Sequence, residues 1–196
     1  MFYRFMQFVF CSYFSALFGA EIVGKENIPQ EGGVILAANH MSNWDPPLLA
    51  SYLPRPVAYM AKVELFAVPI FGGAIRRLHA FPVKRGEGDM GAMKAAVDCV
   101  KGGNVLGIFP EGTRSKDGNL GKAEPGLALI AALTKAPVVP AAIIGTNKIF
   151  SSEEKFPKLR VVYGEPLLFT GNRKNREDLS SFSEEVMNHI GALKER

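Results

Sequence analysis

The chain has 196 residues, of which 47% are hydrophobic and 21% are charged. This length supports one domain with a hydrophobic core, and the composition excludes disordered and collagen-like chains. The net charge of +4 is too small to indicate nucleic-acid binding. However, ten Lys or Arg against five Asp or Glu between Arg55 and Lys116 predict anionic partners for the middle of the chain.

The segment from Phe5 to Ala20 carries no charge and is rich in aromatic residues. As a helix it spans about 24 Å, less than the roughly 30 Å hydrocarbon core of a bilayer. A signal peptide is disfavoured, because only Arg4 is basic and Phe18 stands where a small residue is expected. The aromatic content favours a helix in the membrane interface, with a buried core helix as the alternative. We expect residues 1–24 to associate with the cytoplasmic face of a membrane and residues 25–196 to form the main domain.

Strands and helices alternate after this segment. The apolar patterns predict strands over 34–38, 57–61, 81–83, 105–109, 138–144 and 159–162, and helices over 46–53, 89–101 and 127–133. Ser181 and Glu184 form a capping-box pattern for a C-terminal helix. The order predicts an α/β fold: a single domain with a central mixed, largely parallel sheet flanked by helices, plus the apolar N-terminal membrane-anchoring helix. In such folds ligands gather at the carboxyl ends of strands.

The segment from Asn39 to Pro46 is the first candidate for chemistry. His40 directly follows an expected strand, and an imidazole is suited to taking a proton from an alcohol at neutral pH. Such a base needs a carboxylate on its other ring nitrogen, and Asp45 is the candidate. On one regular helix the two side chains would be about 140° apart, so we expect a turn. Asp45 also has the position of an N-cap for the following helix, and the two roles are compatible.

A second polar segment, residues 109–115, also follows an expected strand. Pro110 ends the strand pairing, and Gly112 lets the backbone approach a ligand closely. Glu111 can accept a hydrogen bond from a substrate hydroxyl, and the Arg114 guanidinium can bind a phosphate. Backbone amides near Gly112 are candidates for stabilising an oxyanion. A surface turn is the alternative interpretation of this segment alone.

In chain order the two segments read Asn-His-x4-Asp and Phe-Pro-Glu-Gly-Thr-Arg-Ser. This combination resembles the glycerolipid acyltransferase family, whose bacterial members include 1-acylglycerol-3-phosphate acyltransferases, over about residues 33–145. The resemblance implies that His40 is the general base and Asp45 its partner. It also implies that the second block binds the acyl acceptor through Glu111, Gly112, Thr113 and Arg114.

Three further positions match the family. Its phosphate-binding arginine corresponds to Arg85, although His79 replaces a usual glycine and Lys84 a usual acid, which leaves the preferred acceptor open. A proline after two apolar residues corresponds to Pro140. Lys62 resembles a basic position that family members place near the acceptor phosphate.

The resemblance implies direct transfer of a fatty acyl chain from acyl-CoA or acyl-carrier protein to the free hydroxyl of a lysophosphatidate. The acyl thioester is a co-substrate, and no cofactor or metal is expected. The expected partners are the lysophospholipid, the thioester, a membrane surface and acyl-carrier protein. Alternatives are a sibling enzyme acting on glycerol-3-phosphate or another lysolipid, and a non-catalytic lipid-binding module.

Other patterns favour no further activity. Residues 86–91 fit the Gly-x-Gly-x-x-Gly pattern of dinucleotide sites, but Glu87 and Asp89 would face the pyrophosphate. The sequence has no Gly-x-Ser-x-Gly elbow of a serine hydrolase. Cys11 and Cys99 form neither a disulfide framework nor a metal quartet.

Overall fold

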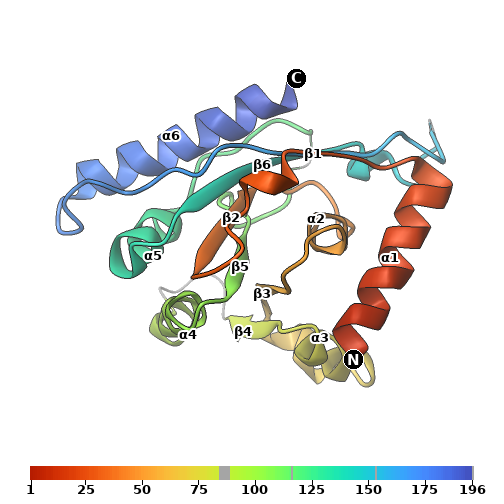
Figure 1. Ribbon diagram of the computed structural model, residues 1–196, viewed down its shortest axis with the longest axis horizontal. Coiled ribbons are helices and arrows are strands. Elements are labelled where there is room, and N and C mark those ends of the chain that lie inside the picture. The colour runs from red at the N-terminus through yellow and green to blue at the C-terminus, as the bar shows by residue number, and fades with distance from the viewer. Residues whose placement is uncertain (84–88, 116, 153, 196) are drawn as a thin grey trace.

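The computed structural model describes residues 1–83, 89–115, 117–152 and 154–195, and it contains a seven-stranded sheet covered by helices on both faces (Figure 1). The strand order is β1-β7-β6-β2-β5-β3-β4, and neighbouring strands are parallel except for β6 and β7. The predicted mixed, largely parallel sheet is confirmed.

The elements are as follows. The strands are β1 (Glu21–Val23), β2 (Val34–Ala38), β3 (Val57–Lys62), β4 (Phe81–Val83), β5 (Val105–Ile108), β6 (Val138–Ile144) and β7 (Arg160–Tyr163). The α-helices are α1 (Phe2–Phe18), α2 (Asp45–Ser51), α3 (Phe71–Arg77), α4 (Met90–Lys101), α5 (Gly126–Thr134) and α6 (Arg176–Lys194). Short 3-10 helices are η1 (Lys25–Asn27), η2 (Val63–Ala67) and η3 (Thr146–Lys148).

Strand β2 shows how the sequence builds a core on each face of the sheet. All of its residues are buried, as expected for a parallel strand covered on both sides. Because successive side chains in a strand point to opposite faces, Leu36 belongs to the core that includes α1 and α2. Ile35 belongs to the core that includes α4, α5 and α6. Figure 1 shows these two groups of helices on either side of the sheet.

Four neighbouring strands, β6, β2, β5 and β3, end at the same edge of the sheet because they run parallel. The segments that follow them therefore emerge close together. These are residues 39–44 after β2, residues 109–115 after β5 and residues 145–146 after β6, while Lys62 is the last residue of β3. Both polar segments of the sequence thus reach one place.

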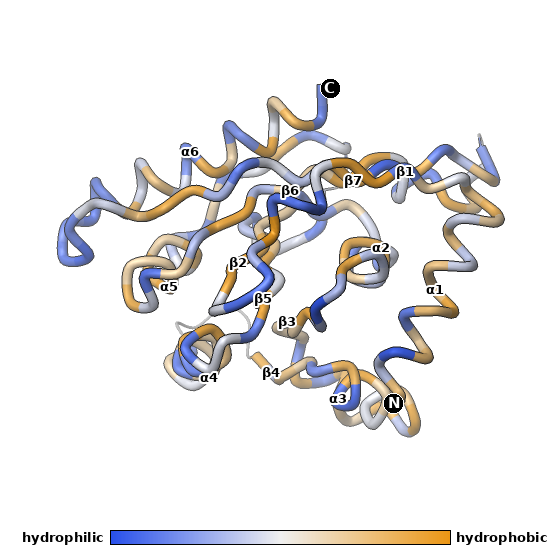
Figure 2. Tube along the Cα trace, viewed as in Figure 1, coloured by the Kyte–Doolittle hydropathy of each residue, from blue (hydrophilic) through white to orange (hydrophobic). Residues whose placement is uncertain are grey.

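Helix α1 has two different faces. Phe14 and Phe18 are buried in the core beside α2, as the core-helix alternative requires. Phe5 and Phe8 are 61% and 70% exposed, and Figure 2 shows apolar residues along much of the helix. Among the described residues, no helix has the length and apolar content needed to cross a membrane.

The predicted elements agree with the structure at β2, β4 and β6, whose bounds match. The sequence pattern does not predict β1, which has three residues, or α3, which contains two adjacent glycines. The predicted capping box at Ser181 and Glu184 is wrong. Helix α6 begins at Arg176, and the Asn175 side chain caps it by accepting from the Glu177 amide at 2.9 Å.

Replacing Gly107 by Ala is expected to destabilise the fold. Gly107 lies in β5, and a Cβ atom there would meet the Tyr59 ring at 2.2 Å. Overpacking of this kind costs about 1–3 kcal/mol, which urea unfolding followed by circular dichroism measures. Gly73→Ala is the control, because its added Cβ meets no tertiary neighbour within 4 Å. An unchanged unfolding midpoint for Gly107→Ala would contradict the close packing of β5 on Tyr59.

Candidate active site

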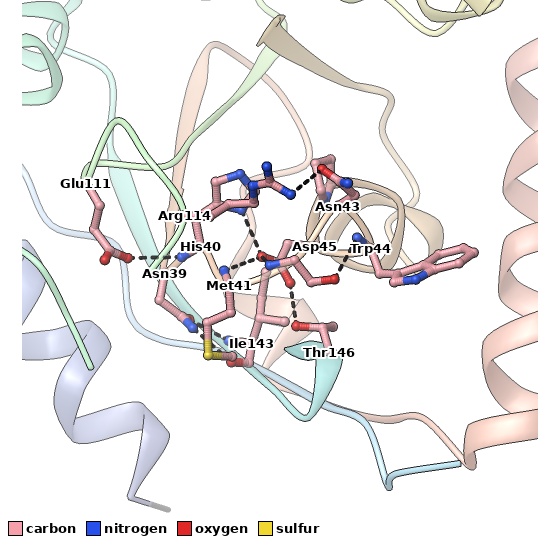
Figure 3. Close-up of polar contacts among 12 residues, drawn as sticks. Asn39, His40, Met41, Asn43, Trp44, Asp45, Glu111, Arg114, Ile143 and Thr146 are labelled. Carbon is pink, nitrogen blue, oxygen red and sulfur yellow. Dashed lines mark hydrogen bonds and ion pairs between the residues drawn. The ribbon is translucent and has the colours of Figure 1, made fainter. Parts of the chain in front are cut away.

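His40 and Asp45 are in direct contact at the carboxyl end of β2 (Figure 3). Nδ1 of His40 lies 2.8 Å from Oδ2 of Asp45. His40 is 9% exposed, and Asp45 is fully buried. The chain between them folds as a turn, in which the Asp45 amide donates to the Ser42 carbonyl at 3.2 Å. The predicted turn that joins the two side chains is confirmed.

The Asp45 carboxylate also binds donors other than the imidazole. Its Oδ2 accepts from the amides of Met41 and Ser42 at 2.6 and 2.7 Å, and its Oδ1 accepts from the Thr146 hydroxyl at 2.5 Å. An ionised carboxylate is an acceptor only, so its contact with Nδ1 places the proton of His40 on that nitrogen. Nε2 is then left with a lone pair that can take a proton.

The predicted capping role of Asp45 is wrong. Helix α2 begins at Asp45, its N-cap is Trp44, and no side chain caps it. The carboxylate instead turns back to the amides of Met41 and Ser42. The two residues after Asp45 are prolines, which have no amide hydrogen to cap. The carboxylate is therefore used by the turn and the imidazole.

An aromatic stack holds the His40 ring. The ring centroids of His40 and Phe109 are 4.1 Å apart with the planes 18° from parallel, and Tyr59 in turn stacks on Phe109 at 6.0 Å. The Tyr59 hydroxyl donates to the Pro46 carbonyl at 3.0 Å. Burial raises the pKa of Tyr59 well above its ordinary value, so it remains a neutral donor. The stack and the Nδ1 contact together fix one orientation of the imidazole.

Asn39 anchors the start of the turn. Its Nδ2 donates to the Ile143 carbonyl at 2.9 Å, and its Oδ1 accepts from the Ile143 amide at 2.7 Å. The side chain is 1% exposed. It extends the pairing of β2 with β6 by one step beyond the last backbone pair, so the position of His40 is tied to two strands.

Glu111 joins the loop after β5 to the backbone of His40. Its Oε1 accepts from the His40 amide at 3.0 Å, and its Oε2 accepts from the Gly121 amide at 2.9 Å. The Ser115 amide donates back to the His40 carbonyl at 2.8 Å. Both carboxylate oxygens are thus occupied by backbone donors. This geometry gives Glu111 a role in holding the loop, and the substrate-hydroxyl contact expected from the sequence stays a prediction.

A cavity of about 780 Å³ lies beside His40 and between α1, α2, β3 and α3. Most of its lining is apolar and includes Phe10, Trp44, Ile75 and Leu78. Its polar lining includes His40, Asn43, Lys62 and Arg114. A cavity with both kinds of lining is suited to a molecule with a charged head and an apolar chain.

Two of the three expected phosphate-binding residues lie at this cavity. The exposed Arg114 donates from Nη1 to Oδ1 of Asn43 at 3.0 Å, and Lys62 is exposed at the end of β3. Arg85 lies outside the described residues, as do residues 86–88 of the glycine-rich pattern. The structure thus brings basic groups from two different strand ends to one place.

The other predicted residues have different surroundings. The Gly112 amide donates to the Phe109 carbonyl at 3.0 Å, so this amide is already used and does not suit an oxyanion. Thr113 is exposed on the same loop. Pro140, which the family resemblance placed among the substrate-binding positions, is buried within β6 and is not among the residues that line this cavity, so that role stays a prediction. It packs close to Gly164, where an added Cβ would lie 3.0 Å from the proline ring.

Sequence reasoning missed the roles of three buried or partly buried residues, Asn39, Phe109 and Thr146. The first two adjoin residues that the sequence singled out, and their position next to a strand end was the available signal. Thr146 follows β6 and contacts Asp45 from 101 positions away in the chain. No local pattern of the sequence marks it.

The sequence and the fold of this chain are similar to those of known proteins. The acyltransferase family profile matches residues 19–144. A Bacillus subtilis protein named 1-acyl-sn-glycerol-3-phosphate acyltransferase is 34% identical over 185 residues, covering 91% of this chain and 89% of that protein. The chloroplastic protein BAT2 of Brassica napus, with the same enzyme name, is 37% identical over 66% of this chain, which spans only 38% of its length. The crystal structure of the 1-acyl-sn-glycerophosphate acyltransferase PlsC from Thermotoga maritima superposes with a TM-score of 0.78 at 29% identity, covering 99% of this chain and 81% of that one.

Replacing Glu111 by Gln is expected to loosen the loop after β5. A carboxamide has one acceptor oxygen, so either the His40 or the Gly121 amide would then face an NH2 group. Leaving a buried donor unpaired costs about 1–3 kcal/mol. We expect hydrogen exchange at these two amides to accelerate by roughly tenfold or more, as measured by mass spectrometry of their peptides. Glu124→Gln, an exposed change on the same loop, is the control, and equal exchange in both variants would argue against the bridging role.

Proposed function

The chain belongs to the acyltransferase family, and we propose that it transfers a fatty acyl chain from an acyl thioester to the free hydroxyl of 1-acylglycerol-3-phosphate, giving phosphatidate. It is an enzyme of phospholipid biosynthesis. The observation that carries the proposal is the 2.8 Å contact of His40 Nδ1 with Asp45, beside a cavity with polar and apolar lining. A lipid-binding module would need the cavity but not an oriented base.

In the proposed mechanism, Nε2 of His40 takes the proton of the acceptor hydroxyl as that oxygen attacks the thioester carbonyl carbon. The carbon–sulfur bond then breaks, and the imidazolium returns the proton to the departing thiolate. No covalent acyl-enzyme forms. Asp45 keeps the proton on Nδ1 and stabilises the transient imidazolium. General base catalysis of this kind contributes about 10²- to 10⁴-fold in rate.

The acceptor phosphate is proposed to bind Arg114 and Lys62, with Arg85 as a third ligand on the basis of the family resemblance. The guanidinium of Arg114 is already oriented by Asn43, which follows His40 in the turn. A phosphate held there would carry its glycerol hydroxyl toward the imidazole. Charged hydrogen bonds of this kind contribute about 1.5–3 kcal/mol each, which here serves to orient the acceptor.

The apolar part of the cavity is proposed to hold a fatty acyl chain. Its lining comes from four separate elements and includes the buried Val57 and the partly buried Phe10 and Leu78. Burying one methylene group stabilises a complex by about 0.8 kcal/mol. The affinity for an acyl chain in this cavity therefore increases with the number of methylene groups that are buried. Glycerol-3-phosphate, the alternative acceptor, has no acyl chain to contribute in this way.

The donor is proposed to be acyl-CoA or acyl-carrier protein, acting as a co-substrate with no further cofactor. His40 and Asp45 supply the base, and the thioester supplies the leaving group, so the reaction balances without a metal or redox group. Among the described residues, no group of three or more His, Cys, Asp or Glu is arranged to hold a metal ion.

Residues 1–24 are proposed to attach the enzyme to the cytoplasmic face of a membrane by lying in its interface. Phe5, Phe8 and Leu17 are exposed on α1, a pattern that suits apolar insertion at headgroup depth. At the end of α1, the exposed rings of Phe150 and Phe156 contact Phe18 in T-shaped and tilted arrangements and enlarge the apolar surface. Both substrates carry acyl chains, and a bilayer is where such chains are concentrated.

Replacing His40 by Ala is expected to lower phosphatidate formation by about 10²- to 10⁴-fold, because the base is lost. The assay incubates the enzyme with lysophosphatidate and an acyl thioester and detects phosphatidate by mass spectrometry. His189→Ala, on the exposed side of α6, is the matched control. Substantial activity in a folded His40→Ala enzyme would refute the proposed base, and wild-type turnover of glycerol-3-phosphate alone would favour the sibling reaction.

Replacing Phe5 and Phe8 together by Ser is expected to weaken vesicle binding by about tenfold or more, since two apolar rings are removed from the interface. Co-sedimentation with vesicles containing anionic lipid measures the bound fraction. Leu168→Ser removes another exposed apolar side chain, far from α1 in sequence, and serves as the control. Unchanged binding of the double variant would place the membrane contact elsewhere.

A further inference from the structure

Thr146 is a buried residue that contacts the catalytic pair from a distant part of the chain. Its hydroxyl donates to Oδ1 of Asp45 at 2.5 Å, and the residue is 1% exposed (Figure 3). Its position is fixed by Gly145, which has a φ of 91° and where a Cβ atom would meet the Lys158 carbonyl oxygen at 2.6 Å. The region matched by the family profile ends at residue 144, so Thr146 lies outside it.

The two oxygens of Asp45 are held in different ways. Oδ2 accepts from His40 Nδ1 and from the amides of Met41 and Ser42. Oδ1 accepts from the Thr146 hydroxyl, and among the described residues this is the donor found at that oxygen. Because the carboxylate is fully buried, removing the hydroxyl leaves Oδ1 unpaired in a low-dielectric site.

We propose that Thr146 is a positioning residue that holds the Asp45 carboxylate in the rotamer which directs Nε2 of His40 at the acceptor hydroxyl. This inference rests on the proposed acyl transfer. A carboxylate with one free oxygen can turn about its Cβ–Cγ bond, which moves Oδ2 out of line with the imidazole and the turn amides. The Thr146 hydroxyl opposes this rotation, because turning would break its own bond to Oδ1.

The other charged or titratable groups around the pair reach it indirectly. Glu111 binds the His40 amide, Tyr59 binds the Pro46 carbonyl, and Arg114 binds Asn43. Thr146 is thus the contact on Oδ1 whose removal should change the position of the carboxylate.

The test compares Thr146→Val, which keeps the shape but removes the hydroxyl, with Thr146→Ser, which keeps the hydroxyl. In the Val variant we expect kcat to fall about 10- to 100-fold, as for loss of a hydrogen bond to a charged group. KM for both substrates should stay within about twofold, because no substrate contact is removed. Thr146→Ser should restore the rate.

Thr134→Val is the matched control, because the Thr134 hydroxyl binds the Ile130 carbonyl in α5, away from the pair. Wild-type kcat in folded Thr146→Val would overturn the proposal. If the Val variant does not fold, Thr146→Ala makes the same test without the added methyl group. If no variant without the hydroxyl folds while Thr146→Ser does, the residue serves stability and the positioning role is wrong.

A second readout is independent of turnover. The chain has three histidines, so the Nδ1 proton of His40 can be assigned by NMR with the aid of His79 and His189 variants. Thr146→Val should shift this resonance, and Thr146→Ser should leave it near the wild-type position. An inactive wild-type enzyme would therefore refute the proposed function alone, whereas an unmoved resonance would refute the role of Thr146.

Discussion

The active-site region depends on one buried negative charge. A carboxylate that is removed from water costs several kcal/mol unless hydrogen-bond donors replace its hydration. Asp45 is fully buried, and its donors are the His40 imidazole, two amides of the turn and the Thr146 hydroxyl. The two amides belong to the turn after β2, the imidazole must carry its proton on Nδ1 to donate, and Thr146 is the first residue of η3. Bonding to one carboxylate therefore fixes the turn, the tautomer and the start of η3. The requirement for a stable buried charge and the requirement for an oriented base are met by the same contacts.

The sheet topology brings those donors together. Strands β6, β2 and β5 are parallel neighbours, so residues far apart in the chain emerge at one edge. Side chains then join the ends of the strands: Asn39 pairs with the backbone of Ile143, and Glu111 accepts from the His40 amide. Glu111 shows why residue type alone does not define a role. Both oxygens of this charged residue in a binding motif accept from backbone amides, one of which belongs to His40.

The sequence predicted the features that depend on neighbouring residues, such as a strand end and a turn. The apolar run 34–38 followed by polar residues located a strand end, and the five-residue spacing of His40 and Asp45 required the turn that is observed. The capping prediction for Asp45 failed because its carboxylate accepts from His40, the amides of Met41 and Ser42 and the Thr146 hydroxyl instead of from amides of the helix. Thr146 could not be predicted, since its contact depends on the pairing of β6 with β2 rather than on neighbouring residues.

Helix α1 connects the proposed membrane attachment to the cavity. Tyr3, Met6 and Phe10 line the cavity, while Phe5 and Phe8 are exposed on the same helix. The helix is held in place because the Gln7 side chain donates to the Leu53 carbonyl at 2.6 Å at the end of α2. Moving an acyl chain through water costs about 0.8 kcal/mol per methylene, a barrier that grows with chain length. A helix that inserts one face in the bilayer and lines the cavity with another shortens that path. The cavity wall and the proposed membrane contact are therefore parts of one helix, and a change in the position of α1 should affect both.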